Sequence, residues 1–273
     1  MSGKLYVVGT PIGNLGDFSP RAVETLENAD FIAAEDTRVT MKLLNHFDIK
    51  KETVSYFEHN KRQKGEMICQ RILAGESCAI VTDAGMPAIS DPGEDLVKLC
   101  HEMGITVESV PGPTAFATAL AISGMSAGRF TFEGFLSVNK KSRREHLEEI
   151  KDEKRTMIFY EAPHKLINTL SDLYSVLGNR EIALVRELTK IHEEVIKTTL
   201  EEAQNLYTEK SPKGEFVIIV SGKAEKAESE ITIDDAVKEA KKLIDGGMSV
   251  NNASKEIASR TPFKKGDIYK ALL

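Results

Sequence analysis

Residues 79–93 read AIVTDAGMPAISDPG, a short apolar run that passes into a loop containing two prolines and two glycines. The apolar run Cys78–Val81 is typical of a buried parallel strand. The prolines prevent a helix from starting at once, and the glycines allow backbone angles that other residues resist. Helical spacing returns only from Glu94. A strand-to-helix link usually needs about 2–6 residues, so this loop is longer than topology requires. Ligands of open α/β sheets bind at loops in this position.

The composition is typical of a globular protein that works in a reducing compartment. The chain has 273 residues, of which 41% are hydrophobic and 29% charged. Its apolar runs are far shorter than the ~20 residues that cross a bilayer, so no membrane association is expected. The first residues lead straight into a strand without an export signal, and three cysteines cannot all be paired. We therefore expect a cytoplasmic protein.

The charge pattern limits the ways in which nucleic acid could bind. A net charge of −6 argues against a protein that coats nucleic acid non-specifically. It does not exclude RNA as a substrate, because local basic patches decide that question. The densest patch is Asn139–Arg144, which is either a solvated surface or a phosphate-binding one.

Strands alternate with helices in the first half, which predicts a mainly parallel sheet. The expected strands are Leu5–Val8, Phe31–Ala34, Val54–Phe57, Cys78–Val81 and Thr106–Val110.

The small, flexible segment Ser123–Gly128 predicts a domain joint. After it we expect a second sheet of mixed direction, because its last strands show no long crossover between them. The expected strands are Phe130–Leu136, Thr156–Tyr160, Ile182–Val185, Val195–Ile196 and Phe216–Val220.

A polar linker is expected at 223–231, followed by three short helices that resemble a helix-turn-helix bundle or a small packing appendage. The predicted domains are 1–123, 129–222 and 232–273.

Four glycine- or proline-rich loops follow strand ends, beginning at Gly9, Asp83, Pro111 and Glu161. The glycines of the first loop do not have the G-x-G-x-x-G spacing, and Pro11 removes a backbone N–H that a pyrophosphate would use. These loops therefore favour a ligand without phosphates, such as an adenosine carrying an amino-acid tail. The histidines and cysteines lie at no metal-ligand spacing, so no metal site is expected. Four carboxylates end strands and could act as bases, as orienting acceptors or as helix anchors: Asp36, Asp83, Glu161 and Glu187.

Seven motifs in order resemble the tetrapyrrole-methylase superfamily and, within it, the bacterial 16S rRNA ribose methyltransferase I branch. They are Gly9–Asp17, Glu35–Arg38, Asp83–Gly93, Pro111–Ala115, Glu161–His164, Arg186–Lys190 and Gly214–Phe216. The resemblance covers about residues 1–222, and the tail is similar to a small C-terminal domain that this branch often carries. Lys165 stands where the branch commonly has arginine, and Met86 and Ala88 replace the usual threonine and leucine.

The resemblance implies two α/β domains of the tetrapyrrole-methylase type, unlike the Rossmann methyltransferases, plus the small helical domain. It also implies a homodimer that methylates the 2′-hydroxyl of a cytidine ribose in the decoding region of 16S rRNA. S-adenosyl-L-methionine would lie between the domains, and the residues mapped to it by motif are Pro11, Asp83, Gly85, Met86, Pro87, Thr114 and Ala115.

A ribose hydroxyl is a poor nucleophile, so a nearby group should take or orient its proton. By position in the motifs, the candidates are Glu187 and Asp36, with Arg38 and Arg186 steering phosphate. The basic stretch 140–144 is a candidate phosphate-binding surface.

Two other hypotheses compete with an rRNA methyltransferase. A methylase of small tetrapyrroles is disfavoured by Thr10-Pro11-Ile12, where that branch prefers a glycine-proline-glycine turn, and by the helical tail. A non-catalytic RNA-binding or ribosome-assembly factor would bind no S-adenosylmethionine.

Overall fold

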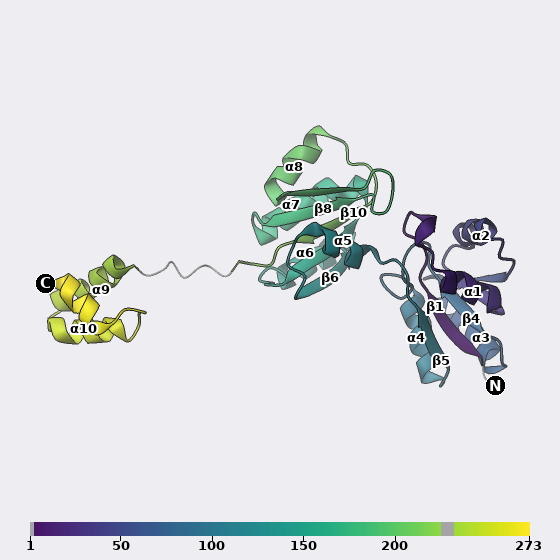
Figure 1. Cartoon of the computed structure of the whole chain (residues 1–273), viewed down its shortest axis with the longest axis horizontal. Helices are drawn as coiled ribbons and strands as arrows, with labels where there is room; N and C mark the ends of the chain where they lie inside the picture. Colours follow the sequence, from purple (N-terminus) through teal and green to yellow (C-terminus); the bar gives the residue numbers. More distant parts are fainter. Residues whose placement is uncertain (1–2, 225–231) are drawn as a thin grey trace. The chain divides into compact units, whose positions relative to one another are not determined.

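The computed structural model describes residues 3–224 and 232–273 (Figure 1). The chain divides into two compact units, Met1–Lys223 and Ala224–Leu273. Most of the linker predicted at 223–231 lies outside the described residues, and the predicted domain boundaries remain predictions.

The first sheet is entirely parallel, with the strand order β3-β2-β4-β1-β5. Its strands are β1 (Lys4–Val8), β2 (Phe31–Ala34), β3 (Glu52–Ser55), β4 (Cys78–Val81) and β5 (Thr106–Val110). The parallel sheet was predicted, but β3 lies earlier than the predicted Val54–Phe57. The side chain of Asn60 accepts a hydrogen bond from the backbone N–H of Phe57 at 2.8 Å, which turns the chain out of the sheet after Ser55.

Helices cover both faces of this sheet (Figure 1). They are α1 (Pro20–Asn28), α2 (Thr37–His46), α3 (Lys61–Leu73) and α4 (Gly93–Glu102), with a short 3-10 helix η1 (Leu15–Asp17). α1 begins as predicted, because Pro20 has no N–H to lose and the Ser19 side chain accepts from the N–H of Ala22. The three cysteines are buried in the core between the sheet, α3 and α4.

The second sheet has the order β6-β7-β10-β8-β9 and mixes directions, as predicted: β6 and β7 are parallel and the other pairs antiparallel. Its strands are β6 (Phe130–Phe135), β7 (Thr156–Glu161), β8 (Glu181–Arg186), β9 (Glu194–Thr199) and β10 (Phe216–Val220). The helices are α6 (Lys140–Glu149), η2 (Pro163–Lys165), α7 (Leu166–Leu177) and α8 (Leu200–Glu209).

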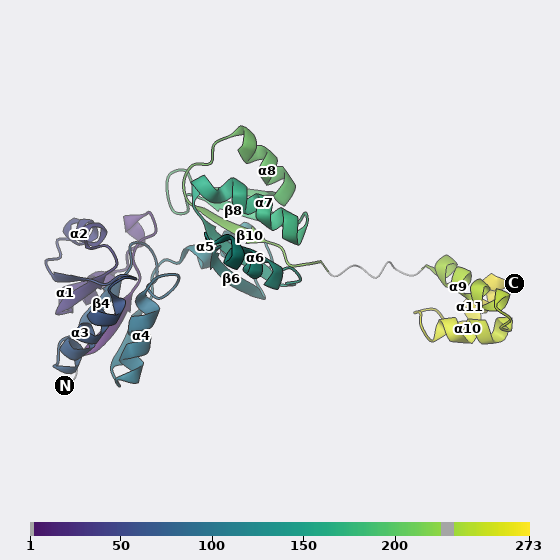
Figure 2. The ribbon, with the colours of Figure 1, turned by 180° about the vertical axis from the view of Figure 1, so that it is seen from behind.

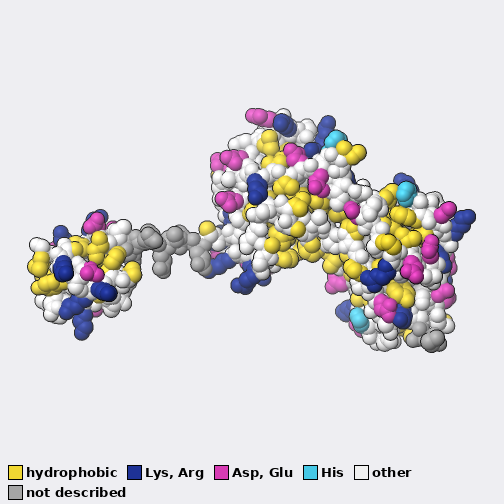
Figure 3. Space-filling model, in the orientation of Figure 1, with side chains coloured by type: hydrophobic (Ala, Val, Ile, Leu, Met, Phe, Trp, Pro, Cys, Tyr) yellow, Lys and Arg dark blue, Asp and Glu magenta, His cyan; other side chains and the backbone are white. Residues whose placement is uncertain are grey.

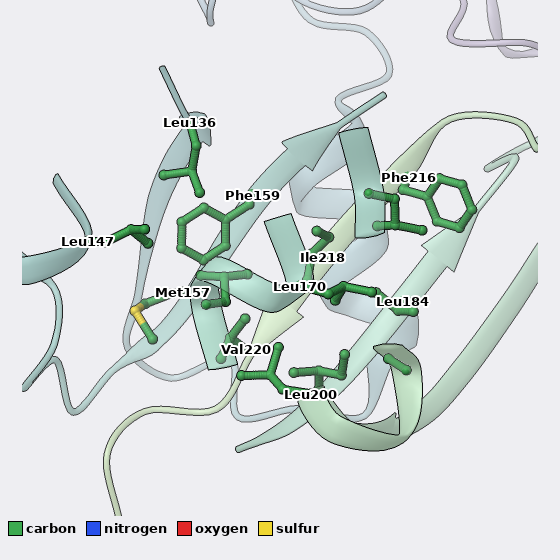
Figure 4. Packing of buried hydrophobic residues seen from close by; sticks show 14 of the residues in the cluster. Leu136, Leu147, Met157, Phe159, Leu170, Leu184, Leu200, Phe216, Ile218 and Val220 are labelled. Atoms are coloured by element: carbon green, nitrogen blue, oxygen red, sulfur yellow. The ribbon is translucent and has the colours of Figure 1, made fainter. Parts of the chain in front are cut away.

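The expectation that no long crossover separates the last strands was wrong, because α8 joins β9 to β10. Thr199 caps this helix by accepting from the N–H of Glu202, and Leu200, Ala203 and Tyr207 bury one side of it. Figure 4 shows the core that these elements share, in which Phe159 and Leu184 of the sheet lie with Leu170 of α7 and Leu200 of α8.

α5 (Ala115–Ser123) packs on the opposite face of the second sheet. Its buried residues Ala119 and Leu120 contact the core formed by Ile158, Val185 and Val217. The predicted boundary at residue 123 would place α5 with the first sheet. Its packing instead ties the chain that follows β5 to the second sheet.

The C-terminal unit is a three-helix bundle of α9 (Ile233–Asp245), α10 (Val250–Ala258) and α11 (Lys265–Leu272). A capping box between Thr232 and Asp235 starts α9, and small residues such as Ala236 and Ala253 let the helices pack closely. Over residues 3–224 and 232–273, no helix has the length and hydrophobicity needed to span a bilayer.

Gly9 and Gly112 bring the loops after β1 and β5 into backbone contact. A Cβ on Gly9 would lie 2.7 Å from the Cα and N of Gly112 and from the Sδ of Met86. A methyl group at either glycine would therefore force the two loops apart.

We expect Gly9→Ala to lower the free energy of unfolding by about 1–3 kcal/mol, the usual cost of overpacking. Urea denaturation followed by circular dichroism measures it. The matched control is Gly128→Ala, whose added Cβ meets no atom within 4 Å and should change stability by less than about 0.5 kcal/mol. Equal stabilities for the two variants would contradict the close approach.

Candidate functional site

A cavity of about 540 Å³ opens among the loops that follow the strands of unit Met1–Lys223. It takes its walls from the segments after β2, β4, β5 and β7 and from β10. Its volume falls in the range of pockets that hold small-molecule ligands. Apolar side chains form much of the wall: Ile12, Met86, Ile89, Phe135, Val185, Leu188, Phe216 and Val217.

The charged side chains that line this cavity are all acidic. They are Glu35, Asp83, Asp91, Glu161 and Glu215. Among the described residues of the lining there is no lysine, arginine or histidine. Such a wall repels phosphate groups and attracts a ligand that carries positive charge.

The loop 83–93 forms one wall of the cavity, and the carboxylate of Asp91 holds its second half. Oδ1 of Asp91 accepts hydrogen bonds from the backbone N–H groups of Ala88 at 2.9 Å and Gly93 at 2.8 Å. Ala88 (φ 69°) and Ser90 (φ 68°) adopt the left-handed conformation that residues with a Cβ disfavour. Strained residues of this kind cluster at ligand sites, where the surrounding structure enforces them.

A backbone bridge joins this loop to the loop after β1. The N–H of Thr10 donates to the carbonyl of Gly85 at 2.9 Å, and the N–H of Gly85 donates to the carbonyl of Thr10 at 3.2 Å. Gly85 has φ 95°, which side chains resist, so glycine is required at this position. The bridge fixes the distance between two walls of the cavity.

The wall contributed by β7 is fixed by three hydrogen bonds to the side chains of Tyr160 and Glu161. Tyr160 accepts from the N–H of Phe116 at 2.9 Å, which connects the cavity wall to the first turn of α5. The buried Glu161 accepts from the Thr169 hydroxyl at 2.5 Å and from the N–H of Ala162 at 2.8 Å.

The electrostatic environments of two neighbouring carboxyls differ. Burial raises the pKa of Asp83 above its ordinary value, and the Glu35 carboxylate adds to the rise. Asp36 lies next to it but outside the lining, and hydrogen bonds from the side chain and backbone of Arg38 lower its pKa to about 2. Burial also raises the pKa of Asp91, against the effect of the two N–H groups that it accepts.

Five of the residues predicted to hold the cofactor line the cavity: Asp83, Gly85, Met86, Thr114 and Ala115. Pro11 and Pro87 belong to the same loops but not to the lining. The structure thus brings most of the predicted set together around one space, while their roles stay predictions.

The four predicted catalytic residues lie outside the lining of the cavity. Asp36 caps α2 and forms an ion pair with Arg38 at 2.6 Å, and Arg186 pairs with Glu194 at 3.0 Å. Glu187 has φ 53° and accepts from the N–H of Glu215 at 3.0 Å and from Nζ of Lys190 at 3.1 Å. Their roles also stay predictions.

Sequence reasoning did not assign several of the lining residues to the site. These are Glu35, Ser90, Asp91, Phe135, Tyr160 and Glu215. Glu35 and Asp91 stood within quoted motifs, and an aspartate two residues before a glycine is a common loop-closing signal. Glu215 likewise stood within the quoted motif Gly214–Phe216. Nothing in the sequence around Phe135 indicated the cavity, because pairing of β6 with β7 in the second sheet brings it there.

Comparison with known proteins identifies the fold. The sequence pattern of the tetrapyrrole (corrin/porphyrin) methylases matches residues 4–204. Ribosomal RNA small subunit methyltransferase I of Synechocystis sp. is 44% identical over 272 residues, covering 99% of this chain and 98% of the relative. The protein of the same name from Halalkalibacterium halodurans is 48% identical over 270 residues, covering 98% of this chain and 93% of the relative.

Two solved structures share the fold at low sequence identity. Uroporphyrin-III-C-methyltransferase from Thermus thermophilus has a TM-score of 0.58 and 19% identity, covering 80% of this chain and 94% of that one. A diphthine synthase has a TM-score of 0.61 and 13% identity, covering 81% and 91%. The predicted fold class is confirmed.

We expect Asp91→Ala to release the loop 83–93. Without the carboxylate, the amides of Ala88 and Gly93 lose a charged acceptor, and their hydrogen exchange should accelerate about ten- to hundredfold. Hydrogen–deuterium exchange followed by mass spectrometry measures this. Asp91→Asn keeps an oxygen acceptor and is the control. Unchanged exchange in the alanine variant would show that the loop is held by other contacts.

The carboxyl of Asp36 should titrate at about pH 2, and Arg38→Gln should return its pKa toward the ordinary value of about 3.9. Because the folded-state pKa is lowered, the interaction stabilises the fold above about pH 4 and is lost as the pH falls through 2. Carbon-13 NMR titration of the side chain reports both values. A normal pKa in the parent protein would show that the Asp36–Arg38 pair does not persist in solution.

Proposed function

This chain belongs to the tetrapyrrole methylase family and to its ribosomal RNA small subunit methyltransferase I group, and we propose that it methylates RNA of the small ribosomal subunit. In its finer form, the proposal is 2′-O-methylation of a cytidine ribose in the decoding region of 16S rRNA. S-adenosyl-L-methionine is the proposed methyl donor. The protein would act in the cytoplasm as a homodimer.

The acidic wall of the cavity is the observation that carries the proposal. S-adenosylmethionine has a positively charged sulfonium and an ammonium group against a single carboxylate, and it has no phosphate. The described lining contains five carboxylates and several apolar side chains, and it contains no basic residue. This composition suits the charge distribution of S-adenosylmethionine. A nucleotide cofactor would face repulsion in the same space.

The residues proposed to hold this cofactor are Pro11, Asp83, Gly85, Met86, Pro87, Thr114 and Ala115. The Thr10–Gly85 bridge and the Asp91 hydrogen bonds keep their backbone amides and carbonyls in place. When bound, the cofactor supplies an electrophilic methyl group. The protein then has to align the ribose hydroxyl with that methyl group and remove a proton.

The carboxyl groups near the cavity differ in how readily they would accept the proton of the ribose hydroxyl. The N–H of Glu215, and then Lys190, hold the pKa of Glu187 below its ordinary value. Hydrogen bonds from Arg38 likewise lower the pKa of Asp36. Asp83 lines the cavity and has a raised pKa, so it is the stronger base. We propose Asp83 as the proton acceptor, with Glu187 and Asp36 as the competing candidates.

Arg38 and Arg186 are proposed to steer RNA phosphates toward the cavity. In the structure each arginine forms an ion pair with a carboxylate, Arg38 with Asp36 and Arg186 with Glu194. The Arg38 side chain is 87% exposed, so a phosphate can reach it without displacing neighbouring side chains.

The test measures transfer of tritium from labelled S-adenosylmethionine to small subunits that lack the modification. We expect incorporation into the 16S RNA, recovered as an alkali-resistant dinucleotide because a 2′-O-methyl group blocks hydrolysis. Asp83→Asn should lower kcat about 100-fold or more, and Glu187→Gln less than about tenfold.

Isothermal titration calorimetry of S-adenosylmethionine provides the control: Glu187→Gln should leave its affinity similar, and Asp83→Asn, which removes one of the five carboxylates of the lining, should weaken it far less than it lowers kcat at saturating cofactor. A protein that binds the cofactor but labels no RNA would contradict the proposed function. A larger loss with Glu187→Gln than with Asp83→Asn would contradict only the assignment of the base.

A further inference from the structure

A second hollow of unit Met1–Lys223 lies in the groove between α6 and α7. It has a volume of about 790 Å³ and contains four basic side chains, of Lys140, Arg143, Arg144 and Lys165, against the two carboxylates of Glu148 and Asp172. Arg143 is only 14% exposed, and it binds Asp172 at 2.6 Å and the Thr169 hydroxyl at 2.8 Å. It is therefore a structural part of the groove.

The other three basic residues of the groove are available to a ligand. Within the described residues, no carboxylate lies within ion-pair distance of Lys140, Arg144 or Lys165. Lys140 and Arg144 are exposed on α6, one turn apart, and Lys165 is half-buried at the start of α7. Positive side chains that converge on a groove without local neutralisation suit a polyanion.

A larger hollow of this unit, near Gly222, has a different charge pattern. Its volume is about 1160 Å³, and four carboxylates face three basic residues there. Arg155, one of the three, is bound to Glu153 at 2.6 Å. The volume of a hollow therefore does not show whether it suits a polyanion. Over the face of the molecule seen in Figure 3, charges of both signs are mixed. The α6–α7 groove differs because its unneutralised charge is positive.

A short segment connects the groove to the cavity. Phe135 lines the cavity and is 57% exposed, whereas Ser137, Val138 and Lys140 line the groove. Val138 is 79% exposed. Five residues of extended chain reach at most about 17 Å, so the two sites lie within a few nucleotides of each other.

Side-chain hydrogen bonds make a second connection. The Thr169 hydroxyl donates to Glu161 in the cavity wall and accepts from Nη2 of Arg143 in the groove. Because Glu161 and Thr169 are buried, this chain of contacts fixes α7 and α6 relative to the cavity.

We propose that Phe135 and the α6–α7 groove form a track for single-stranded RNA beside the methylation site. A base next to the target nucleotide stacks on Phe135, and the following phosphates bind Lys140, Arg144 and Lys165. The inference rests on the proposed function for the identity of the polyanion. Exposed aromatic rings combined with basic side chains are the usual means of binding single strands, because every base has a face that can stack.

Side-chain chemistry favours RNA over an acidic protein segment as the occupant. The groove wall offers neutral donors, among them Asn168 and Ser171, that can reach phosphate or ribose oxygens. The exposed ring of Phe135 beside these charges suits a strand in which every phosphate is accompanied by a base that can stack.

The experiment measures binding of a fluorescent single-stranded RNA, with the sequence of the decoding region, to the full chain over a range of salt concentrations. The variant Lys140→Glu/Arg144→Glu should weaken binding about tenfold and reduce the salt slope by about 1.4, since each phosphate contact on a single strand contributes about 0.7. Its matched control is Lys50→Glu/Lys98→Glu, which makes the same charge change at exposed positions outside the groove. Equal effects of the two variants would overturn the track.

Phe135 is tested by a pair of substitutions. Phe135→Leu should weaken RNA binding about tenfold through lost stacking, and Phe135→Tyr should restore it. Because Phe135 also lines the cavity, the affinity for S-adenosylmethionine is measured on the same variants, and in Phe135→Leu the loss of RNA affinity should be several-fold larger than any loss of cofactor affinity. A selective loss of cofactor affinity in Phe135→Leu would place the ring against the cofactor and overturn its role in the track.

Two outcomes separate this inference from the proposed function. RNA binding that depends on the groove, in a protein that transfers no methyl group, supports the track and contradicts the proposed function. Methyl transfer with normal kcat/KM for RNA in Lys140→Glu/Arg144→Glu supports the function and overturns the track. Displacement of the RNA by polyglutamate at equal charge concentration would also overturn it, because the groove would then recognise acidic chains in general.

Discussion

Close backbone contact between three loops is the constraint on which the site depends. The loops after β1 and β5 touch at Gly9 and Gly112, where neither position has room for a Cβ. The loops after β1 and β4 are joined by the two hydrogen bonds between Thr10 and Gly85. A parallel sheet places all three loops at the same edge, and the glycines allow them to meet there. The part of the cavity wall that these three loops form is therefore held in place by backbone contacts, which fix its donors and acceptors.

The proposed function accounts for the separation of charge within unit Met1–Lys223. The cavity is lined by five carboxylates, and the nearby α6–α7 groove has three basic side chains without ion-pair partners among the described residues. The basic groove would repel a cationic cofactor, and the acidic cavity would repel a polyanionic substrate. Each ligand would therefore bind at its own site. This local arrangement matters more for RNA binding than the net charge of −6, which argues only against non-specific coating of nucleic acid.

Much of the fold was predictable because local signals agreed with the tertiary structure. Ser19-Pro20 started a helix and Cys78–Val81 formed a strand within the residues expected. α8 was missed because its apolar residues Leu200, Ala203 and Tyr207 are few and lie among glutamates. In the site, loop residues such as Gly85 could be predicted from their motifs. Phe135 could not, because pairing of β6 with β7 in the second sheet decides where it lies.

The position of α5 explains how the two sheets form one functional unit. It follows the loop at Gly112, and Thr114 and Ala115 at its start line the cavity, while its apolar residues pack on the second sheet. Tyr160 of β7 accepts a hydrogen bond from its first turn. α5 thus connects the loop after β5 of the first sheet to the face of the second sheet. Burial of Ala119 and Leu120 opposes separation of α5 from the second sheet, so core packing holds Thr114 and Ala115 in place at the cavity.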